Sequence, residues 1–207
     1  MKIERNIIVF LFLIHIVGII GYLSPVHDSF KLLSPLSILA IVAAIIFNQP
    51  NKGLKSYITF IILVAAGFLI ECVGVATGKI FGNYQYGITL GSKLMEVPPI
   101  IGFNWLMLVM ASGQIANKLK INIWLKAGIG SIMLVLLDFL IEPIAIQYDF
   151  WSWQNNSIPF QNYSSWFIVA YLFLLFYLKN NSKADNKAAQ WLYVFQIIFF
   201  LTLNIFL

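Results

Sequence analysis

The stretch AGIGSIMLVLLDFLIEPIAIQ, residues 127–147, contains 21 residues, of which only Asp138 and Glu142 carry charge. A helix rises about 1.5 Å per residue, so about 20 apolar residues cross the ~30 Å hydrocarbon core of a bilayer. In lipid every backbone N–H and C=O must find a partner within the protein, and a single segment achieves this only as a helix. The stretch therefore predicts a membrane-spanning helix that carries two acids.

Six further apolar runs of similar length occur along the chain, at residues 7–23, 32–47, 57–75, 97–116, 163–178 and 190–207. Of the 207 residues, 60% are hydrophobic and 10% charged, against about 25% charged in a typical soluble domain. The first run is followed by no small-residue cleavage site, so it is interpreted as a spanning helix. The sequence predicts an all-α, polytopic membrane helical bundle of about seven transmembrane helices, forming a single integral membrane domain over residues 1–207.

The basic residues predict the orientation of this bundle. With the N-terminus in the cytoplasm, only Lys31, Lys79 and Lys93 fall in outer segments. The ten in inner segments are Lys2, Arg5, Lys52, Lys55, Lys118, Lys120, Lys126, Lys179, Lys183 and Lys187. An excess of Lys and Arg in cytoplasmic segments sets membrane topology. We expect a multi-pass protein of the inner (cytoplasmic) membrane, with the N-terminus inside and the C-terminus outside, and the net charge of +5 needs no nucleic-acid partner to explain it.

Few residues are available for metal or redox chemistry. Cys72 is the one cysteine, which excludes an intrachain disulfide and any cysteine-based zinc or iron–sulfur site. The two histidines, His15 and His27, argue against a bis-histidine haem and a histidine-rich di-iron cluster. We expect no metal site.

The acidic residues gather toward the predicted outer side. Glu4 and Asp185 are cytoplasmic in this topology, and the other six lie in the outer half or in outer loops: Asp28, Glu71, Glu96, Asp138, Glu142 and Asp149. Carboxyl groups within a membrane are costly and usually mark a functional site. The acids are therefore the main indication of function.

Helix geometry places several of these residues at comparable depth. Asp138 lies roughly 17 Å into an outward-running helix, and Glu142 lies one turn further along the same face. Glu71 lies roughly 21 Å along the third helix, and Asn104 and Trp105 lie roughly 11–13 Å from the outer surface on the fourth. We expect them to converge on one cavity in the outer leaflet.

Two carboxyl groups one turn apart in a medium of low dielectric constant cannot both ionise without a large cost, so at least one is expected to stay protonated. A neutral carboxylic acid can donate a proton to an alkene, and electron-rich rings stabilise a neighbouring cation. This combination favours chemistry on a polyene or isoprenoid. A purely structural interpretation remains open, in which the acids pair with polar neighbours and the aromatic residues form an interfacial belt.

At these residues the chain resembles the carotenoid biosynthesis protein family, which includes carotenoid 1,2-hydratases of the bacterioruberin and myxol type. The first half of the pattern is present as Glu71, Gly74, Thr77-Gly78, Phe81-Gly82-Asn83-Tyr84-Gln85-Tyr86, Gly91, Val97-Pro98 and Trp105. The second half is present as Asp138, Glu142-Pro143, Trp151-Ser152-Trp153 and Ile158-Pro159-Phe160-Gln161-Asn162-Tyr163-Ser164-Ser165-Trp166. The resemblance covers residues 67–170, with Ile80 in place of an expected Pro and Ser165 in place of an expected Gly.

The resemblance implies that water is added across the terminal 1,2 double bond of an acyclic carotenoid end, without a cofactor. The implied catalytic residues are Asp138, Glu142 and Glu71. Our mechanistic hypothesis is that Asp138 or Glu142 protonates C2 and that a second carboxylate positions the water. The implied substrate-binding residues are Asn83, Tyr84, Tyr86, Asn104, Trp105, Trp151, Trp153 and Trp166. The implied partners are a carotenoid or another polyene isoprenoid, membrane lipid and other enzymes of carotenoid synthesis.

Two alternatives remain at this stage. A non-catalytic carotenoid- or lipid-binding membrane protein would need the cavity and the aromatic residues but not the acids. An enzyme like the membrane lycopene cyclases would use the same protonation and trap the cation with an internal alkene. A retinal protein is rejected because the last helix, residues 190–207, has no lysine, and a prenyltransferase is rejected because paired Asp-rich motifs are missing.

Overall fold

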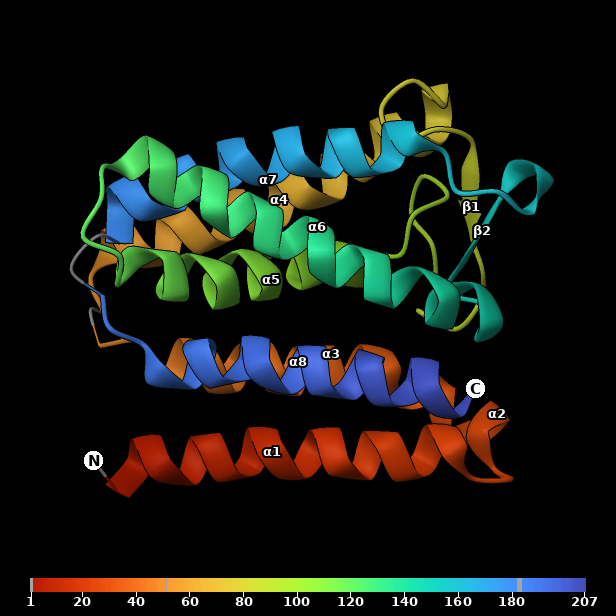
Figure 1. Cartoon of the computed structure of the whole chain (residues 1–207), viewed down its shortest axis with the longest axis horizontal. Coiled ribbons are helices and arrows are strands. Elements are labelled where there is room, and N and C mark those ends of the chain that lie inside the picture. The colour runs from red at the N-terminus through yellow and green to blue at the C-terminus, as the bar shows by residue number, and fades with distance from the viewer. Residues whose placement is uncertain (1, 51, 182–183) are drawn as a thin grey trace.

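The chain folds into a bundle of long helices with a small strand-bearing cap at one end (Figure 1). The structure is a computed structural model and describes residues 2–50, 52–181 and 184–207; Lys183, counted above among the inner lysines, lies outside the described residues. The long helices are α1 (Lys2–Leu23), α3 (Ser34–Phe47), α4 (Leu54–Thr77), α5 (Ile100–Asn117), α6 (Ile123–Gln147), α7 (Phe160–Asn181) and α8 (Lys187–Phe206). The short elements are α2 (His27–Phe30), η1 (Lys31–Leu33), β1 (Tyr84–Tyr86), β2 (Trp151–Trp153) and η2 (Gln154–Asn156). The predicted all-α bundle is confirmed.

Six segments among the described residues are long and apolar enough to cross a membrane: α1, residues 27–47, α4, α5, α6 and α8. The remaining long helix, α7, has 22 residues but carries polar side chains near both ends, including Asn162 and Asn181. It nevertheless lies alongside α4 and α6 in the bundle (Figure 1). Large apolar side chains such as Ile61, Leu136 and Phe139 are exposed on the outside, as expected for surfaces that face lipid. The chain is a multi-pass membrane protein.

The start of α5 differs from the predicted run in a way that changes the depth of two site residues. The run beginning at residue 97 becomes helical only at Ile100, because Leu94 and Val97 pair across a tight turn in which Met95 and Glu96 have positive φ angles. Pro98 and Pro99 also lack the N–H groups that would bond to the carbonyls of residues 94 and 95, so the helix cannot continue back through that turn. Residues 104 and 105 therefore lie about 6–8 Å from the start of α5, instead of the 11–13 Å expected.

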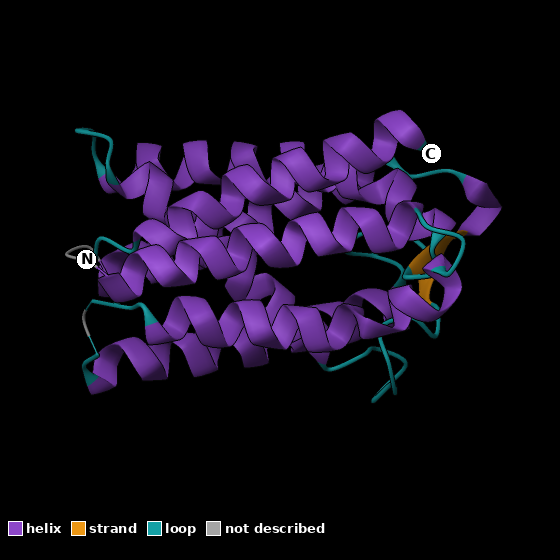
Figure 2. Ribbon diagram, turned by 90° about the horizontal axis from the view of Figure 1, so that it is seen from below, coloured by secondary structure: helices purple, strands orange, loops and turns teal. Residues whose placement is uncertain are grey.

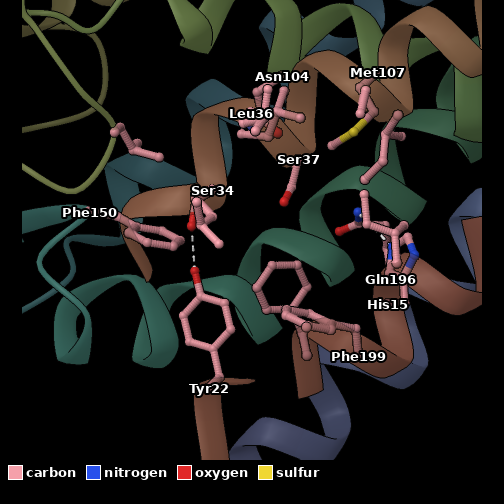
Figure 3. Close-up of a pocket in the computed structure, with 18 of the residues that line it drawn as sticks. His15, Tyr22, Ser34, Leu36, Ser37, Asn104, Met107, Phe150, Gln196 and Phe199 are labelled. Atoms are coloured by element: carbon pink, nitrogen blue, oxygen red, sulfur yellow. Dashed lines mark hydrogen bonds between the residues drawn. The ribbon is translucent and has the colours of Figure 1, made fainter. Parts of the chain in front are cut away.

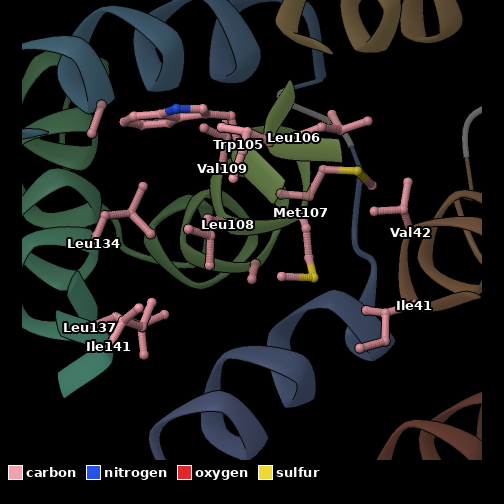
Figure 4. Packing of buried hydrophobic residues seen from close by; sticks show 14 of the residues in the cluster. Ile41, Val42, Trp105, Leu106, Met107, Leu108, Val109, Leu134, Leu137 and Ile141 are labelled. Atoms are coloured by element: carbon pink, nitrogen blue, oxygen red, sulfur yellow. The ribbon is translucent and has the colours of Figure 1, made fainter. Parts of the chain in front are cut away.

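Helix α5 is the centre of the bundle, with 14 of its 18 residues buried. Figure 4 shows its side chains between those of α6 and α3, with Leu134 on one side and Val42 on the other. Helix α4 approaches it closely, because a Cβ added at Gly67 would lie 2.6 Å from Cβ of Trp105. Glu71 follows Gly67 by one helical turn and so lies on the face that meets α5.

At the end of the bundle that holds the N-terminus, buried amides connect four helices. We call Gln49, Gln114, Tyr177, Asn181 and Asn186 the amide network. The Asn186 side chain donates to the carbonyl of Ile45 at 2.8 Å and to Gln49 Oε1 at 3.2 Å, and its backbone N–H donates to Gln114 Oε1 at 2.8 Å. Gln114 in turn donates to the Tyr177 hydroxyl at 2.6 Å, and Gln49 donates to Asn181 at 3.3 Å. This network fixes the start of α8 to α3, α5 and α7.

At the opposite end, the segment between α4 and α5 pairs with the segment between α6 and α7. Strands β1 and β2 form a two-stranded antiparallel sheet across the end of the bundle (Figure 2). Three-residue strands separated by more than sixty residues leave no periodic signal that a sequence pattern could detect. The loop between α4 and β1 begins at Gly78, whose φ of 63° ends α4 in the left-handed conformation typical of glycine.

Candidate active site

The small sheet brings four aromatic side chains together. Tyr84 lies opposite Trp153, and Tyr86 lies opposite Trp151. Side chains alternate along a strand, and residues directly opposite in an antiparallel pair point to the same face. The Tyr-x-Tyr and Trp-x-Trp spacings therefore place all four polar ring atoms over the helices, while Gln85 between the tyrosines is exposed.

Glu71, on α4, is buried and accepts hydrogen bonds from three neutral donors. The hydroxyls of Tyr84 and Tyr86 donate to its Oε2 at 2.5 and 2.9 Å, and Trp105 Nε1 donates to its Oε1 at 3.0 Å. Burial, and then the nearby charge of Glu71, raises the pKa of both tyrosines, which keeps them protonated as donors. These hydrogen bonds offset part of the cost of burying a carboxylate.

Glu142 and Asp138 lie one turn apart on α6 and share an amide donor. Trp151 Nε1 and Trp153 Nε1 donate to Glu142 Oε2 at 3.0 and 2.7 Å. Asn162, in the first turn of α7, donates through Nδ2 to Asp138 Oδ2 at 2.9 Å and to Glu142 Oε1 at 3.3 Å. Asp138 Oδ1 is buried without a hydrogen-bond partner among the described residues. Glu142 thus accepts hydrogen bonds from three donors, and Asp138 accepts one.

No cation among the described residues pairs with these three acids. The ion pairs in that part of the chain involve Asp28, Asp185 and Glu4 instead. The described residues also contain no group of three or more His, Cys, Asp or Glu side chains that could hold a metal ion. Among the described residues, any negative charge on these carboxyl groups is therefore compensated by O–H and N–H donors alone.

A small cavity, which we call the acid cavity, lies against two of the three acids. Its volume is about 30 Å³, and its wall includes Glu71, Glu142 and Asn162. A water molecule needs roughly 10–15 Å³ of such space and two to four polar partners, so the cavity suits one or two waters. Trp105 and Trp166, which stack with ring centroids 4.4 Å apart, form another part of the wall. Asp138 does not line this cavity and is connected to it through Asn162.

A larger cavity, which we call the apolar cavity, adjoins the first. Its volume is about 370 Å³, and its wall is mostly apolar side chains of α1, α3, α5, α6 and α8 (Figure 3). Ile101, Asn104 and Trp151 line both cavities. The buried His15 in its wall is already hydrogen-bonded, to the carbonyl of Leu11 at 2.6 Å and to Gln196 at 3.1 Å.

The structure places most of the site residues expected from the sequence around these two cavities. Tyr84, Tyr86, Trp105, Trp153 and Trp166 line the acid cavity, and Asn104 and Trp151 line both.

Asn83 does not belong to this group. Its side chain is exposed, it lines neither cavity, and its carbonyl accepts a hydrogen bond from the backbone of Gln154 at 2.9 Å. Asn162 was not among the expected site residues, although it bridges two acids. An amide in the first turn of the helix that follows the Asp138–Glu142 helix was the available signal, because antiparallel neighbours bring those two helix ends together.

Two comparisons with known proteins are informative, and a third finds no match. The model of the family described as "Carotenoid biosynthesis protein" matches residues 33–207, most of the chain. A protein of Haloarcula japonica named bisanhydrobacterioruberin hydratase is 28% identical over 131 residues, which are 58% of this chain and 43% of the relative. The chain thus spans less than half the length of that relative. No solved structure matches.

The two positions that depart from the family pattern lie next to each other. The Ser165 hydroxyl, on α7, donates a hydrogen bond to the carbonyl of Ile80. Neither residue lines the acid cavity. Neither residue is among the hydrogen-bond donors to the three acids.

Proposed function

The chain belongs to the carotenoid biosynthesis protein family, and on that premise we propose that it is a carotenoid hydratase, adding water to the terminal 1,2 double bond of an acyclic carotenoid end. The observation that carries this proposal is a cluster of buried acids without a cation, beside a cavity sized for water. A proton donor, a proton acceptor and a water are the components that alkene hydration requires. The name of the Haloarcula relative supports the same reaction class.

The proton source is the pair formed by Asp138 and Glu142. Two carboxyl groups that share one amide donor, with no cation nearby, are most stable holding one proton between them. Glu142 lines the acid cavity and Asp138 does not, so Glu142 delivers the proton to the substrate. Asp138 is a positioning residue, which shares the proton and keeps Glu142 oriented through Asn162.

The reaction then balances with the residues present. The π electrons of the double bond take the proton from Glu142 onto C2, which leaves a tertiary cation at C1. A water in the acid cavity attacks C1 and gives up one proton to Glu71. The next water that enters the cavity carries that proton from Glu71 to Glu142, which restores both groups. The net change is the gain of one hydrogen at C2 and one hydroxyl at C1.

Aromatic rings in the wall stabilise the cation. Trp105 and Trp166 stack at 4.4 Å, and Tyr84 and Trp153 lie with centroids 5.2 Å apart. A cation within about 6 Å of such a ring face gains roughly 0.5–2 kcal/mol. Tyr84, Trp105 and Trp153 are held by hydrogen bonds to the acids, and Trp166 stacks on Trp105. The four rings therefore need little rearrangement when charge develops.

Expression of the full chain in a lycopene-producing bacterium tests the proposed reaction. Mass analysis of the pigments should show a gain of one or two waters relative to cells that lack the gene. An unchanged mass with a shortened chromophore would replace hydration by cyclisation. Unchanged pigments in cells that contain the folded protein would instead favour a binding protein.

The proposed orientation places the acid cavity in the outer leaflet of the inner membrane. The end of the bundle opposite the sheet holds the N-terminus and the loops that carry most of the lysines (Figure 1). Reporter fusions at Lys118 and Asn156 should report the cytoplasm and the exterior, respectively, by the excess of basic residues in cytoplasmic segments. The reverse pattern would place the site in the inner leaflet.

A further inference from the structure

The acid cavity is too small to hold a polyene. Its volume of about 30 Å³ accommodates one or two waters, and the polar ring atoms around it already donate to Glu71 or Glu142. Most of the aromatic residues that the sequence suggests as substrate-binding therefore surround a space sized for water. The long apolar part of the substrate needs another place.

The apolar cavity has the size and lining for one end of such a molecule. Pockets that bury small organic ligands have volumes of about 300–1,000 Å³, and this one has about 370 Å³. Side chains such as Ile14, Ile41 and Met107 make its wall largely apolar. The hydroxyl of Tyr22 is bonded to Ser34 at 2.5 Å, so this polar group in the wall already has a partner.

This cavity has an apolar rim on the outside of the bundle, between α1 and α3. Among its lining residues, Val17 of α1 is 53% exposed and Leu36 of α3 is 65% exposed. The deeper residues Ile101 and Ile141 are buried. In a membrane, exposed apolar side chains of spanning segments face acyl chains, so the rim is a lateral opening to lipid, where a carotenoid is dissolved.

The inner end of the apolar cavity meets the acid cavity. Ile101, Asn104 and Trp151 line both. Asn104 is half-buried, and its side chain makes no hydrogen bond to a described residue. At this boundary the side-chain amide of Asn104 can hydrogen-bond to the attacking water. Its oxygen can also accept a hydrogen bond from the new tertiary hydroxyl.

We propose that the apolar cavity binds the acyclic isoprenoid end of the substrate, which enters from lipid between α1 and α3 and presents its terminal double bond to the acids beside Asn104. This assignment rests on the proposed hydratase function and names where that substrate binds. The remaining polyene extends out of the opening into the bilayer. Substrate and water thus approach the acids from two separate cavities.

A matched pair of substitutions on α3 tests the assignment. Ala40 lines the apolar cavity, whereas Ala43, about one turn away on the same helix, is exposed and does not line it. Ala40→Phe fills the cavity, and Ala43→Phe adds the same ring on the lipid side. In purified full-length protein reconstituted with lycopene, Ala40→Phe should lower both bound lycopene and hydrated product about tenfold or more. Ala43→Phe should keep both within about twofold of the wild-type values.

Two results separate this proposal from the proposed function. Wild-type binding and product in Ala40→Phe would overturn the cavity assignment and leave the hydratase intact. If the wild-type protein binds lycopene without hydrating it, and Ala40→Phe abolishes that binding, the cavity assignment stands and the hydratase proposal fails. Ser37→Leu, a smaller change in the same wall, is the substitute if Ala40→Phe does not accumulate in the membrane, and it should lower binding in the same direction.

Discussion

The two ends of the bundle both bury many polar side chains, but they do so with different chemistry. The amide network at one end consists of neutral groups that hydrogen-bond one another and backbone carbonyls. The cluster beneath the sheet contains three carboxyl groups, one orphaned oxygen and a cavity. A satisfied neutral network rigidifies a protein, whereas buried acids without cations cost stability and are retained where they serve a reaction.

The contrast extends to the donors. At the amide end, Gln, Asn and Tyr side chains can both donate and accept hydrogen bonds, so they satisfy one another's polar groups. Beneath the sheet, Glu71 and Glu142 receive five ring donors in all, two phenols and three indoles. Indole and protonated phenol supply hydrogen bonds without a formal charge, so the acids remain able to exchange protons. In the proposed function, one end is structural and the other is where the reaction takes place.

The largest expected effect is the loss of product in Glu142→Gln. The amide keeps the shape of the side chain but removes the transferable proton, and general acid catalysis is typically worth about 10²–10⁴-fold. Pigment analysis should show this loss while the protein still inserts into the membrane and binds carotenoid. Glu96→Gln, an exposed acid near the same end, is the matched control and should retain wild-type product.

Asp138→Asn should lower product and also change its pH dependence. Because Asp138 shares a proton with Glu142 in this account, its removal leaves Glu142 to titrate alone. The rate–pH profile of the reconstituted enzyme measures this. An unchanged rate–pH profile together with a lower protein yield would show that Asp138 contributes only to packing.

Asn186→Leu, in the amide network, should act on stability instead. The substitution removes the hydrogen-bond donor to Gln49 Oε1 and to the carbonyl of Ile45. It also removes the side-chain acceptor for Ala189 N–H at the start of α8. Stranded buried groups and a lost helix cap together cost about 2 kcal/mol or more. Thermal unfolding in detergent should show a lower midpoint, while product per folded molecule stays at the wild-type level. A selective loss of turnover would contradict the division between the two ends.

The sequence predicted much of this architecture and part of the candidate site. Apolar runs of about 20 residues give the helices directly, because lipid permits little else. Helix rise placed Asp138, Glu142 and Glu71 at similar depths. The pattern of apolar residues does not predict the start of α5, because the turn before it depends on the positive φ angles of Met95 and Glu96.

The pairing of β1 with β2 could not be predicted from the sequence, and this pairing explains the Tyr-x-Tyr and Trp-x-Trp spacings. It depends on contacts between segments more than sixty residues apart, which local sequence patterns do not report. The separation of Asp138 from the acid cavity and the position of the apolar cavity depend likewise on how helices pack. Local periodicity shows which residues share a face, but it does not show which side chain lies behind Asn162.

Asp185→Asn should have the smallest effect. The Asp185 carboxylate pairs with Lys118 at 2.6 Å near the amide end, and that hydrogen bond holds its pKa below the usual value. A lowered pKa means that the contribution to stability is present at neutral pH and is lost as pH falls through the folded-state pKa. Both side chains are about half exposed, and such surface pairs contribute about 0–1 kcal/mol. Unfolding midpoints and product at pH 7 should match the wild type closely, unlike those of an acid beneath the sheet.

Protonation of carbon is the central claim, and hydration in deuterated water measures it most directly. If a carboxyl group exchanges its proton with solvent and delivers it to C2, each hydroxylated end must carry one carbon-bound deuterium there, located by mass fragmentation or NMR of the purified pigment. Hydroxylated product without carbon-bound deuterium would contradict acid-catalysed hydration and, with it, the roles assigned to Glu142, Asp138 and Glu71.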